Sequence, residues 1–318
     1  MLLLILFLVC LAVQMGYLLA CTRLLRPEPT AAAPPERVSV IVCAHNERPR
    51  LPRLLAALRA QTHPDFEVIV VDDRSDDGTF DWLQRQARGD ARIRPVRVVN
   101  TPPGVSPKKW ALTQGVRAAG GKVLLLTDAD CCPVGPEWIV RMQSRCRGAH
   151  EVVLGLGFYH RAPGWLNRLI RFETLTTAVR YVTLARWGCP YMGVGRNLAY
   201  RPTLFAEHGG LHAHRHVLSG DDDLFVNAVS RPGRVAVCTH PAARTLSEPK
   251  RTWRGWYRQK RRHMSAGRHY RPRDQWRLSA LEATHIGVWV LGAALLAGSW
   301  WELATFGLTL RAGAQSLI

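Results

Sequence analysis

The stretch Val123-Leu124-Leu125-Leu126-Thr127-Asp128-Ala129-Asp130 joins an apolar run to two carboxylates one residue apart. The apolar run predicts a buried strand, and side chains two residues apart on a strand point to the same side. Paired carboxylates can hold a hard divalent cation, Mg²⁺ or Mn²⁺, against phosphate groups. Asp-x-Asp also occurs in ordinary polar turns, so its meaning depends on the rest of the chain.

The residues before this stretch alternate between predicted strands and predicted helices. The strands are expected at 38–43, 66–71 and 96–99, and the helices at 51–61, 80–87 and 109–119. Such alternation predicts an α/β fold with a doubly wound, Rossmann-like sheet, which binds nucleotides beyond the carboxyl ends of its strands.

Two further acidic clusters accompany Asp128 and Asp130. Asp72 and Asp73 end the predicted strand 66–71, and the triplet 221–223 follows later in the chain. Because the polar clusters fall at the expected strand ends, they favour an enzyme that uses an activated nucleotide-sugar over a solvated turn.

The composition indicates anionic partners and reduced cysteines. Lys and Arg number 43 against 24 Asp and Glu, a net charge of +19, which suits nucleic acid, anionic lipid headgroups or nucleotide diphosphates. The eight cysteines follow no zinc-like spacing, and the adjacent Cys131 and Cys132 suit neither a regular disulfide nor a C-x-x-C metal site. We therefore expect reduced thiols in a cytosolic domain.

Residues 1–22 carry no charge and are long enough to cross a bilayer. A cleaved signal peptide is the alternative, but no basic region precedes the apolar core and no small-x-small cleavage site is evident. Arg23 and Arg26 follow directly, which predicts a cytoplasmic location for what comes next. The Pro- and Ala-rich residues up to 36 are expected to form a linker, 23–36.

The second half of the chain contains a further apolar stretch, residues 283–301, with three tryptophans. It predicts a membrane helix, with a buried core helix as the alternative, inside a C-terminal membrane segment 275–318. Residues 303–310 are too short to span, so a further helix beyond residue 318 is an expectation. Residues 161–187 predict either an amphipathic helix on the membrane surface or a helix packed on the sheet. The domain between these segments is expected at 37–274.

Over about residues 38–270 the chain resembles the membrane-anchored family 2 glycosyltransferases with a GT-A fold. The resemblance rests on motifs that occur in the family's order. They are residues 40–47, residues 70–79, Lys108, Asp128-Ala129-Asp130, Ser219-Gly220-Asp221-Asp222 and Gln259-Lys260-Arg261-Arg262-His263.

The resemblance implies a role for each matching residue. Asp130 and Asp128 would hold Mg²⁺ or Mn²⁺, with Asp128 also near the ribose, and Asp73 would bind the base. The remaining nucleotide contacts would come from Ala44, Asn46, Glu47 and Lys108. The implied catalytic residues are Asp222 as general base, with Asp221 and Asp223 as alternatives, together with Arg262 and Gln259.

The chemistry of sugar transfer explains these residue types. Displacing a nucleoside diphosphate from an anomeric carbon builds negative charge on the leaving phosphate, which a metal ion and fixed cations such as Lys108 and Arg262 would offset. A general base opposite the leaving group, for which Asp222 is the first candidate, would take the acceptor's proton. This arrangement predicts inversion at the anomeric carbon.

Two features depart from the simplest pattern. The last motif ends in His263, where processive synthases of the family have Trp, which disfavours long-polymer synthesis. The string His208, His212, His214 and His216 would bind zinc if alternation placed the last three on one side of a strand. The alternative is a polar loop that gates the donor site.

We therefore expect a metal-dependent inverting glycosyltransferase in the inner or plasma membrane, with its catalytic domain facing the cytoplasm. The expected donor is a UDP-sugar, and the expected acceptor is a lipid or a membrane-associated glycan, without nucleic acid. The alternatives are a processive polysaccharide synthase of the same family, a basic nucleic-acid-binding membrane protein, and an inactive sugar-nucleotide sensor.

Overall fold

The computed structural model of the chain describes residues 1–22 and 34–316, which divide into two compact units. One unit comprises residues 34–270, and the other comprises residues 1–22 and 271–316. Most of the predicted linker, residues 23–33, lies outside the described residues.

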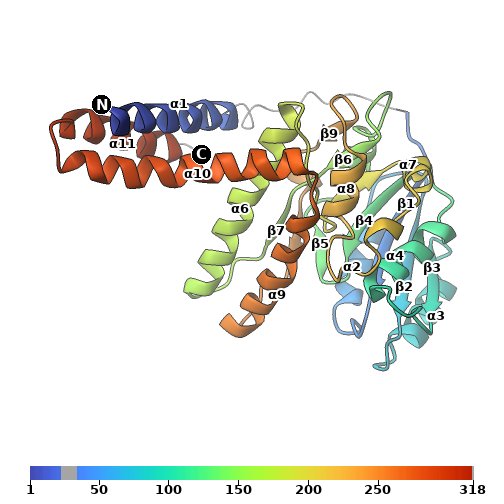
Figure 1. The fold of residues 1–318 in the computed structure, drawn as a ribbon. Coiled ribbons are helices and arrows are strands. Elements are labelled where there is room, and N and C mark those ends of the chain that lie inside the picture. Colours follow the sequence, from blue (N-terminus) through green and yellow to red (C-terminus); the bar gives the residue numbers. More distant parts are fainter. Residues whose placement is uncertain (23–33, 317–318) are drawn as a thin grey trace. The chain divides into compact units, whose positions relative to one another are not determined.

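The larger unit is built on a mixed sheet with the strand order β3-β2-β1-β4-β8-β6-β9 (Figure 1). The central strands β3, β2, β1 and β4 are parallel, as the alternating pattern predicts. The sheet strands are β1 (Val38–Ala44), β2 (Phe66–Asp73), β3 (Ile93–Val98), β4 (Val123–Asp128), β6 (Val152–Leu154), β8 (Leu198–Tyr200) and β9 (Val235–Val237).

The register of the parallel strands brings their polar ends together. Ala44 at the end of β1 pairs with Asp72 of β2, and Cys43 pairs with Asp128 of β4. Because parallel strands share one carboxyl edge, three motifs separated by up to 80 or so residues meet at this edge.

Helices cover both faces of the parallel sheet. On one face, Val38, Val40 and Val42 pack in a core with buried side chains of α2, α3 and α5. On the other face, Ile69 and Val71 pack with Ala111 of α4. The helices of this part are α2 (Leu51–Arg59), α3 (Thr79–Gly89), α4 (Pro107–Ala118) and α5 (Trp138–Gln143).

The second half of the unit contains features that periodicity did not predict. Strand β8 is antiparallel to β4 and β6, and β5 (Cys131–Pro133), β10 (Thr245–Ser247) and β7 (Gly157–Tyr159) form a separate small sheet. These strands are three residues long, too short to show alternation. The helices here are α6 (Trp165–Arg186), α7 (Pro202–Glu207), α8 (Asp223–Val229) and α9 (Trp253–Ala266), with short 3₁₀ turns η2 (His212–His214), η3 (Pro241–Ala243) and η4 (Gly267–His269).

The smaller unit consists of α1 (Leu2–Thr22), α10 (Pro272–Leu296) and α11 (Trp301–Ser316). Helices α1 and α10 have the length and composition of membrane spans, with mean hydropathies of 2.6 and 1.4. The predicted single helix over 283–301 is wrong at both ends, because α10 begins at Pro272 and ends at Leu296, and α11 begins at Trp301.

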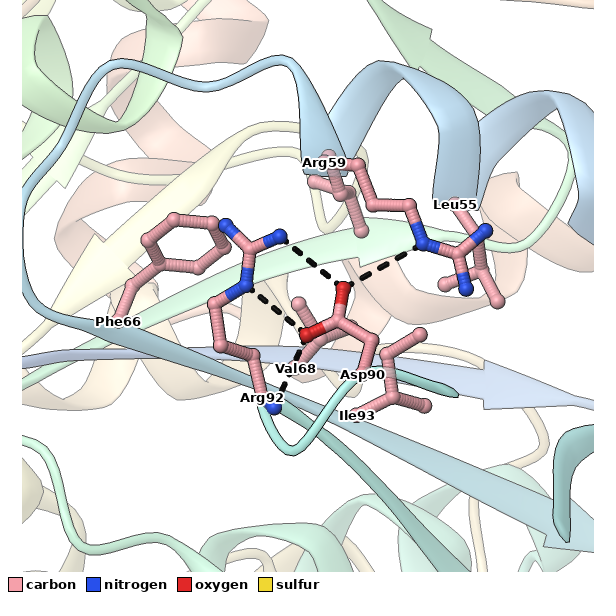
Figure 2. A pocket seen from close by; sticks show the side chains of 8 residues that line it. Leu55, Arg59, Phe66, Val68, Asp90, Arg92 and Ile93 are labelled. Atoms are coloured by element: carbon pink, nitrogen blue, oxygen red, sulfur yellow. Dashed lines mark hydrogen bonds and ion pairs between the residues drawn. The ribbon is translucent and has the colours of Figure 1, made fainter. Parts of the chain in front are cut away.

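A shallow hollow in the larger unit lies away from the polar strand ends. Arg59 and Arg92 both pair with Asp90 there, over Phe66 and Ile93 (Figure 2). Ile93 begins β3 and Phe66 begins β2, so the hollow is at the amino edge of the sheet. The Asp90 carboxylate is already paired with both arginines, which indicates a structural role for this hollow.

Candidate active site

The turns after β1 and β2 are fastened to each other. The His45 ring nitrogen Nδ1 lies 2.6 Å from the Asp73 carbonyl, and the Asn46 amide donates to Ser75 Oγ at 2.9 Å. The Asn46 side chain in turn accepts from the Asp76 amide at 3.0 Å. Both Asn46 and Arg74 have φ of 57°, a left-handed conformation that side chains rarely adopt. The predicted nucleotide contacts Ala44, Asn46 and Asp73 are thus brought together in one rigid corner.

The two aspartates that end β2 have different surroundings. Asp72 is fully buried, and this burial raises its pKa. Asp73 accepts from the Arg74 guanidinium through both carboxylate oxygens, at 2.7 and 3.2 Å. Glu47 similarly pairs with Arg50 at 2.5 Å. A nucleotide base that binds Asp73 would therefore have to displace the Arg74 guanidinium from it.

Asp128, Asp130 and the Cys131 thiol present ligand atoms that all lie within 4.8 Å of one another. Burial and the neighbouring Asp128 charge raise the pKa of Asp130. Among the described residues, Asp130 forms no ion pair with a basic side chain. Burial raises the pKa of the Cys131 thiol well above its usual range, so the thiol stays neutral at pH 7 and is a weak ligand. The two carboxylates therefore fit a hard divalent cation, which would balance their charge.

Lys108, in the first turn of α4, joins two of the acidic clusters. Its Nζ lies 3.1 Å from Asp128 Oδ1 and 2.9 Å from Asp221 Oδ2. Burial alone would raise the pKa of Asp128, but the charge and hydrogen bond of Lys108, together with the smaller effect of Arg196, lower that pKa. The prediction that Lys108 and Asp128 share a site agrees with this geometry, and Asp221 joins them.

The three carboxylates of the acidic triplet point to three different partners. Asp221 faces Lys108, and Asp222 accepts from the backbone amides of Gly195 at 2.5 Å and Asp223 at 2.8 Å. Asp223 accepts from the Tyr270 hydroxyl at 2.8 Å. Burial and the Asp222 charge raise the pKa of Asp223 to about 7. Of the three, Asp221 alone is turned toward the pair Asp128 and Lys108.

The histidine string does not form the strand that a zinc site would need. Residues 212–214 form the 3₁₀ turn η2, and the metal-ligand cluster found in the described part of the chain contains no histidine. The segment is fastened to the start of α4, where Lys109 Nζ donates to the His214 carbonyl at 2.7 Å and the Ser106 amide donates to Arg215 at 2.7 Å. Its role as a gate stays a prediction.

The predicted residues of α9 are only partly brought to the site. Gln259 Nε2 donates to the Tyr159 hydroxyl at 3.4 Å, a contact with β7. Burial and the neighbouring cations, Arg262 first among them, lower the pKa of His263 to about 4, so its imidazole is neutral near pH 7. The Arg262 side chain is exposed, and none of the described contacts joins it to Asp128 or Asp130.

Three residues near the acidic centre escaped the sequence analysis. They are Arg196, whose charge acts on Asp128, Tyr270, which binds Asp223, and Cys131. Cys131 directly follows the Asp-x-Asp motif, and that adjacency could have identified it. Arg196 lies 68 residues after Asp128 in the sequence, and Tyr270 lies 47 residues after Asp223. No local sequence pattern connects either residue with its acidic partner.

Comparisons with known proteins identify the family of the chain. The model for "Glycosyl transferase family 2" matches residues 39–215, more than half of the chain. A probable glycosyltransferase of Bacillus subtilis is 27% identical over 234 residues, covering 71% of this chain and 54% of the relative. An undecaprenyl-phosphate mannosyltransferase of Micrococcus luteus is 33% identical over 142 residues, covering 43% of this chain and 53% of the relative. The chain thus spans about half the length of these two curated relatives.

One solved structure is similar over nearly the whole chain. A mannosyltransferase from Pyrobaculum calidifontis, in complex with GDP-Man and Mn²⁺, aligns with a TM-score of 0.61 and 21% identity. The alignment covers 99% of this chain and 94% of that protein, and it shows a shared fold. By its family match, the chain belongs to glycosyl transferase family 2, and its fold is of the GT-A type.

Proposed function

We propose that this enzyme transfers one sugar, with inversion, from a nucleotide-sugar to a lipid-linked or membrane-associated acceptor, and that it needs Mg²⁺ or Mn²⁺. The single observation that carries the proposal is the convergence of Asp128, Asp130, Lys108 and Asp221 at one carboxyl edge of the sheet. The expected donor is a UDP-sugar. A GDP-sugar is the alternative, because the similar Pyrobaculum enzyme was studied with GDP-Man.

Asp130 and Asp128 would hold the divalent cation. Once bound, such an ion offsets the negative charge that develops on the leaving diphosphate. Lys108 contributes a fixed positive charge at the same place, since its ammonium already lies 3.1 Å from Asp128. The turns at Asn46 and Asp73 would bind the nucleoside, with Glu47 beside them.

The acceptor's proton would pass to the acidic triplet. Each oxygen of Asp222 accepts one hydrogen bond from a backbone amide, whereas Asp221 faces the acidic centre and contacts Lys108. The sequence predicts Asp222 as general base, and that prediction is untested; from these contacts we propose Asp221 in its place, with Asp222 as the alternative. Asp222 would then hold the start of α8 and the loop at Gly195 in position.

The acceptor is proposed to be a lipid phosphate or another membrane-associated molecule. Two helices of the chain, α1 and α10, could cross a membrane, and the similar Micrococcus enzyme is named for undecaprenyl phosphate. Arg23 and Arg26 support a cytoplasmic location for the catalytic domain, 37–274, by the positive-inside rule. His263, in place of the Trp of processive synthases, favours the addition of one or a few sugars.

A substrate panel tests the proposal. The full chain in detergent would be given UDP- and GDP-sugars with Mn²⁺, with and without undecaprenyl phosphate, while release of the nucleoside diphosphate is measured. Acceptor-dependent release, with a singly glycosylated lipid in the mass spectrum, is the expected result. A ladder of long glycans would favour the processive alternative, and no release from any donor would favour the inactive sensor.

A further inference from the structure

Arg196 is a cation near the acidic centre. In the described part of the chain, no carboxylate lies within ion-pair distance of it. It lies in the loop before β8, directly after Gly195, whose amide binds Asp222. Its Nη1 atom is buried and has no hydrogen-bond partner among residues 1–22 and 34–316. Burying an unsatisfied N–H of a charged group is costly, and such groups in proteins are normally paired.

The chain holds this side chain in a fixed place. The Arg196 carbonyl accepts from Thr127 Oγ1 on β4 and from Thr245 Oγ1 on β10, both at 3.1 Å. The guanidinium lies over the Tyr159 ring, 4.5 Å from its centroid. Gly157 makes room, because a Cβ there would lie 3.2 Å from Arg196 Cβ. A guanidinium stacked in this way is preorganised, and its remaining N–H groups stay available to a ligand.

The electrostatic neighbourhood of Arg196 is the acidic centre. Besides the larger opposing effects of burial and of Lys108, Arg196 contributes to the lowered pKa of Asp128. Its charge also acts on Asp130. Tyr159, on which it stacks, bonds to Gln259 of α9. Arg196 therefore lies between the metal-binding pair and α9, where an anionic group of a substrate would bind.

We propose that Arg196, stacked on Tyr159, forms a phosphate-binding subsite of the active site. A planar guanidinium with free N–H groups matches phosphate oxygens, and a bound phosphate would pair the buried Nη1. The phosphate would belong either to the donor's diphosphate or to a lipid-phosphate acceptor. This inference rests on the proposed function, and it adds a residue that none of the motifs identified.

The competing view is that Arg196 only packs against its aromatic partner. The chain contains a matched control for that view. Arg244 lies over the ring of Phe158, 5.8 Å from its centroid, and also has a buried, unpartnered Nε atom. Phe158 and Tyr159 are consecutive on β7, so they point to opposite faces. Arg244 thus has the same packing without the acidic centre.

The test compares Arg196→Gln, Arg196→Lys and Arg244→Gln in the full detergent-solubilised chain. Calorimetry compares the binding of UDP and GDP in Mn²⁺ with that of uridine and guanosine, and so measures how much the donor phosphates contribute to affinity. The KM for undecaprenyl phosphate reports on binding of the acceptor phosphate. If Arg196 binds the donor, Arg196→Gln weakens nucleoside diphosphate binding by about tenfold or more, whereas nucleoside binding is unchanged. If it binds the acceptor, nucleotide affinity is kept and the KM for the lipid phosphate rises by a similar factor.

In either case, Arg196→Lys should recover part of the loss, because it keeps the charge without the planar fork. Equal behaviour of Arg196→Gln and Arg244→Gln, in a wild type that does transfer sugar, would overturn the subsite alone. Melting temperatures of the three variants separate a binding defect from unfolding. A wild type that transfers no sugar and binds neither nucleotide would overturn the proposed function itself, and this inference with it.

Discussion

The two acidic clusters of the site, Asp128 with Asp130 and the triplet 221–223, differ in how their charges are satisfied. Asp130 has no basic partner in the described part of the chain, and Asp128 shares one lysine with Asp221. In the triplet, by contrast, Asp222 and Asp223 accept from backbone amides and from Tyr270. A carboxylate that has no cation beside it, or only a lysine side chain, can exchange that partner for a ligand, whereas a carboxylate bonded to backbone amides holds the fold in place. We therefore propose that Asp130 and Asp221 take part in the chemistry and that Asp222 and Asp223 hold the structure.

The largest expected effect is that of Asp221→Asn on catalysis. If Asp221 takes the acceptor's proton, its amide analogue should lower kcat by about a hundredfold or more. Affinity for the nucleoside diphosphate should change little, since Asp221 does not hold the donor. Steady-state kinetics and calorimetry check the two parts. Turnover retained in Asp221→Asn but lost in Asp222→Asn would reverse the assignment.

A smaller effect, on stability, is expected for Asp222→Ala. The change would leave the amides of Gly195 and Asp223 without their acceptor, which costs about 1–3 kcal/mol for a buried group. Thermal unfolding of the full chain in detergent measures it, with Asp81→Ala, an exposed carboxylate of α3, as the control. An unchanged melting temperature would show that Asp222 is not structural.

The smallest effect concerns the pH dependence of stability. Because the pKa of Asp223 is raised to about 7, the folded protein keeps a proton that the unfolded chain loses near its ordinary pKa of about 4. This contribution to stability is complete below about pH 4 and is lost as the pH rises to about 7. Asp223→Asn should flatten this part of the melting-temperature profile, and a profile parallel to that of wild type would contradict the raised pKa.

The same contrast explains what the sequence could predict. Asp128 and Asp130 follow a long apolar strand, so their place at the sheet's carboxyl edge could be read from local pattern alone. The hydrogen-bond partners of the triplet could not be predicted in this way, because Gly195 and Tyr270 lie in loops distant in sequence from it. Asp222 and Asp221 are neighbours in sequence, and only the helix start at Asp223 turns their side chains to different partners.

Another limit appears in the cationic residues. Lys108 was predicted from the family resemblance, and it does lie beside Asp128. Arg262 was predicted from its motif, yet its side chain is exposed, and none of its described contacts is with Asp128 or Asp130. Arg196 had no motif at all, because its position depends on contacts with β4, β7 and β10 that are distant in sequence.

The most direct test of the account is the metal dependence of nucleotide binding through Asp130. Calorimetry of wild type and Asp130→Asn with UDP and GDP, in Mn²⁺ and in EDTA, would make the measurement. We expect wild type to bind one of the nucleotides with Mn²⁺ and at least about tenfold more weakly in EDTA, and Asp130→Asn to bind weakly in both. Equal affinity of wild type in Mn²⁺ and EDTA would contradict the central claim that Asp128 and Asp130 hold a divalent cation for the donor.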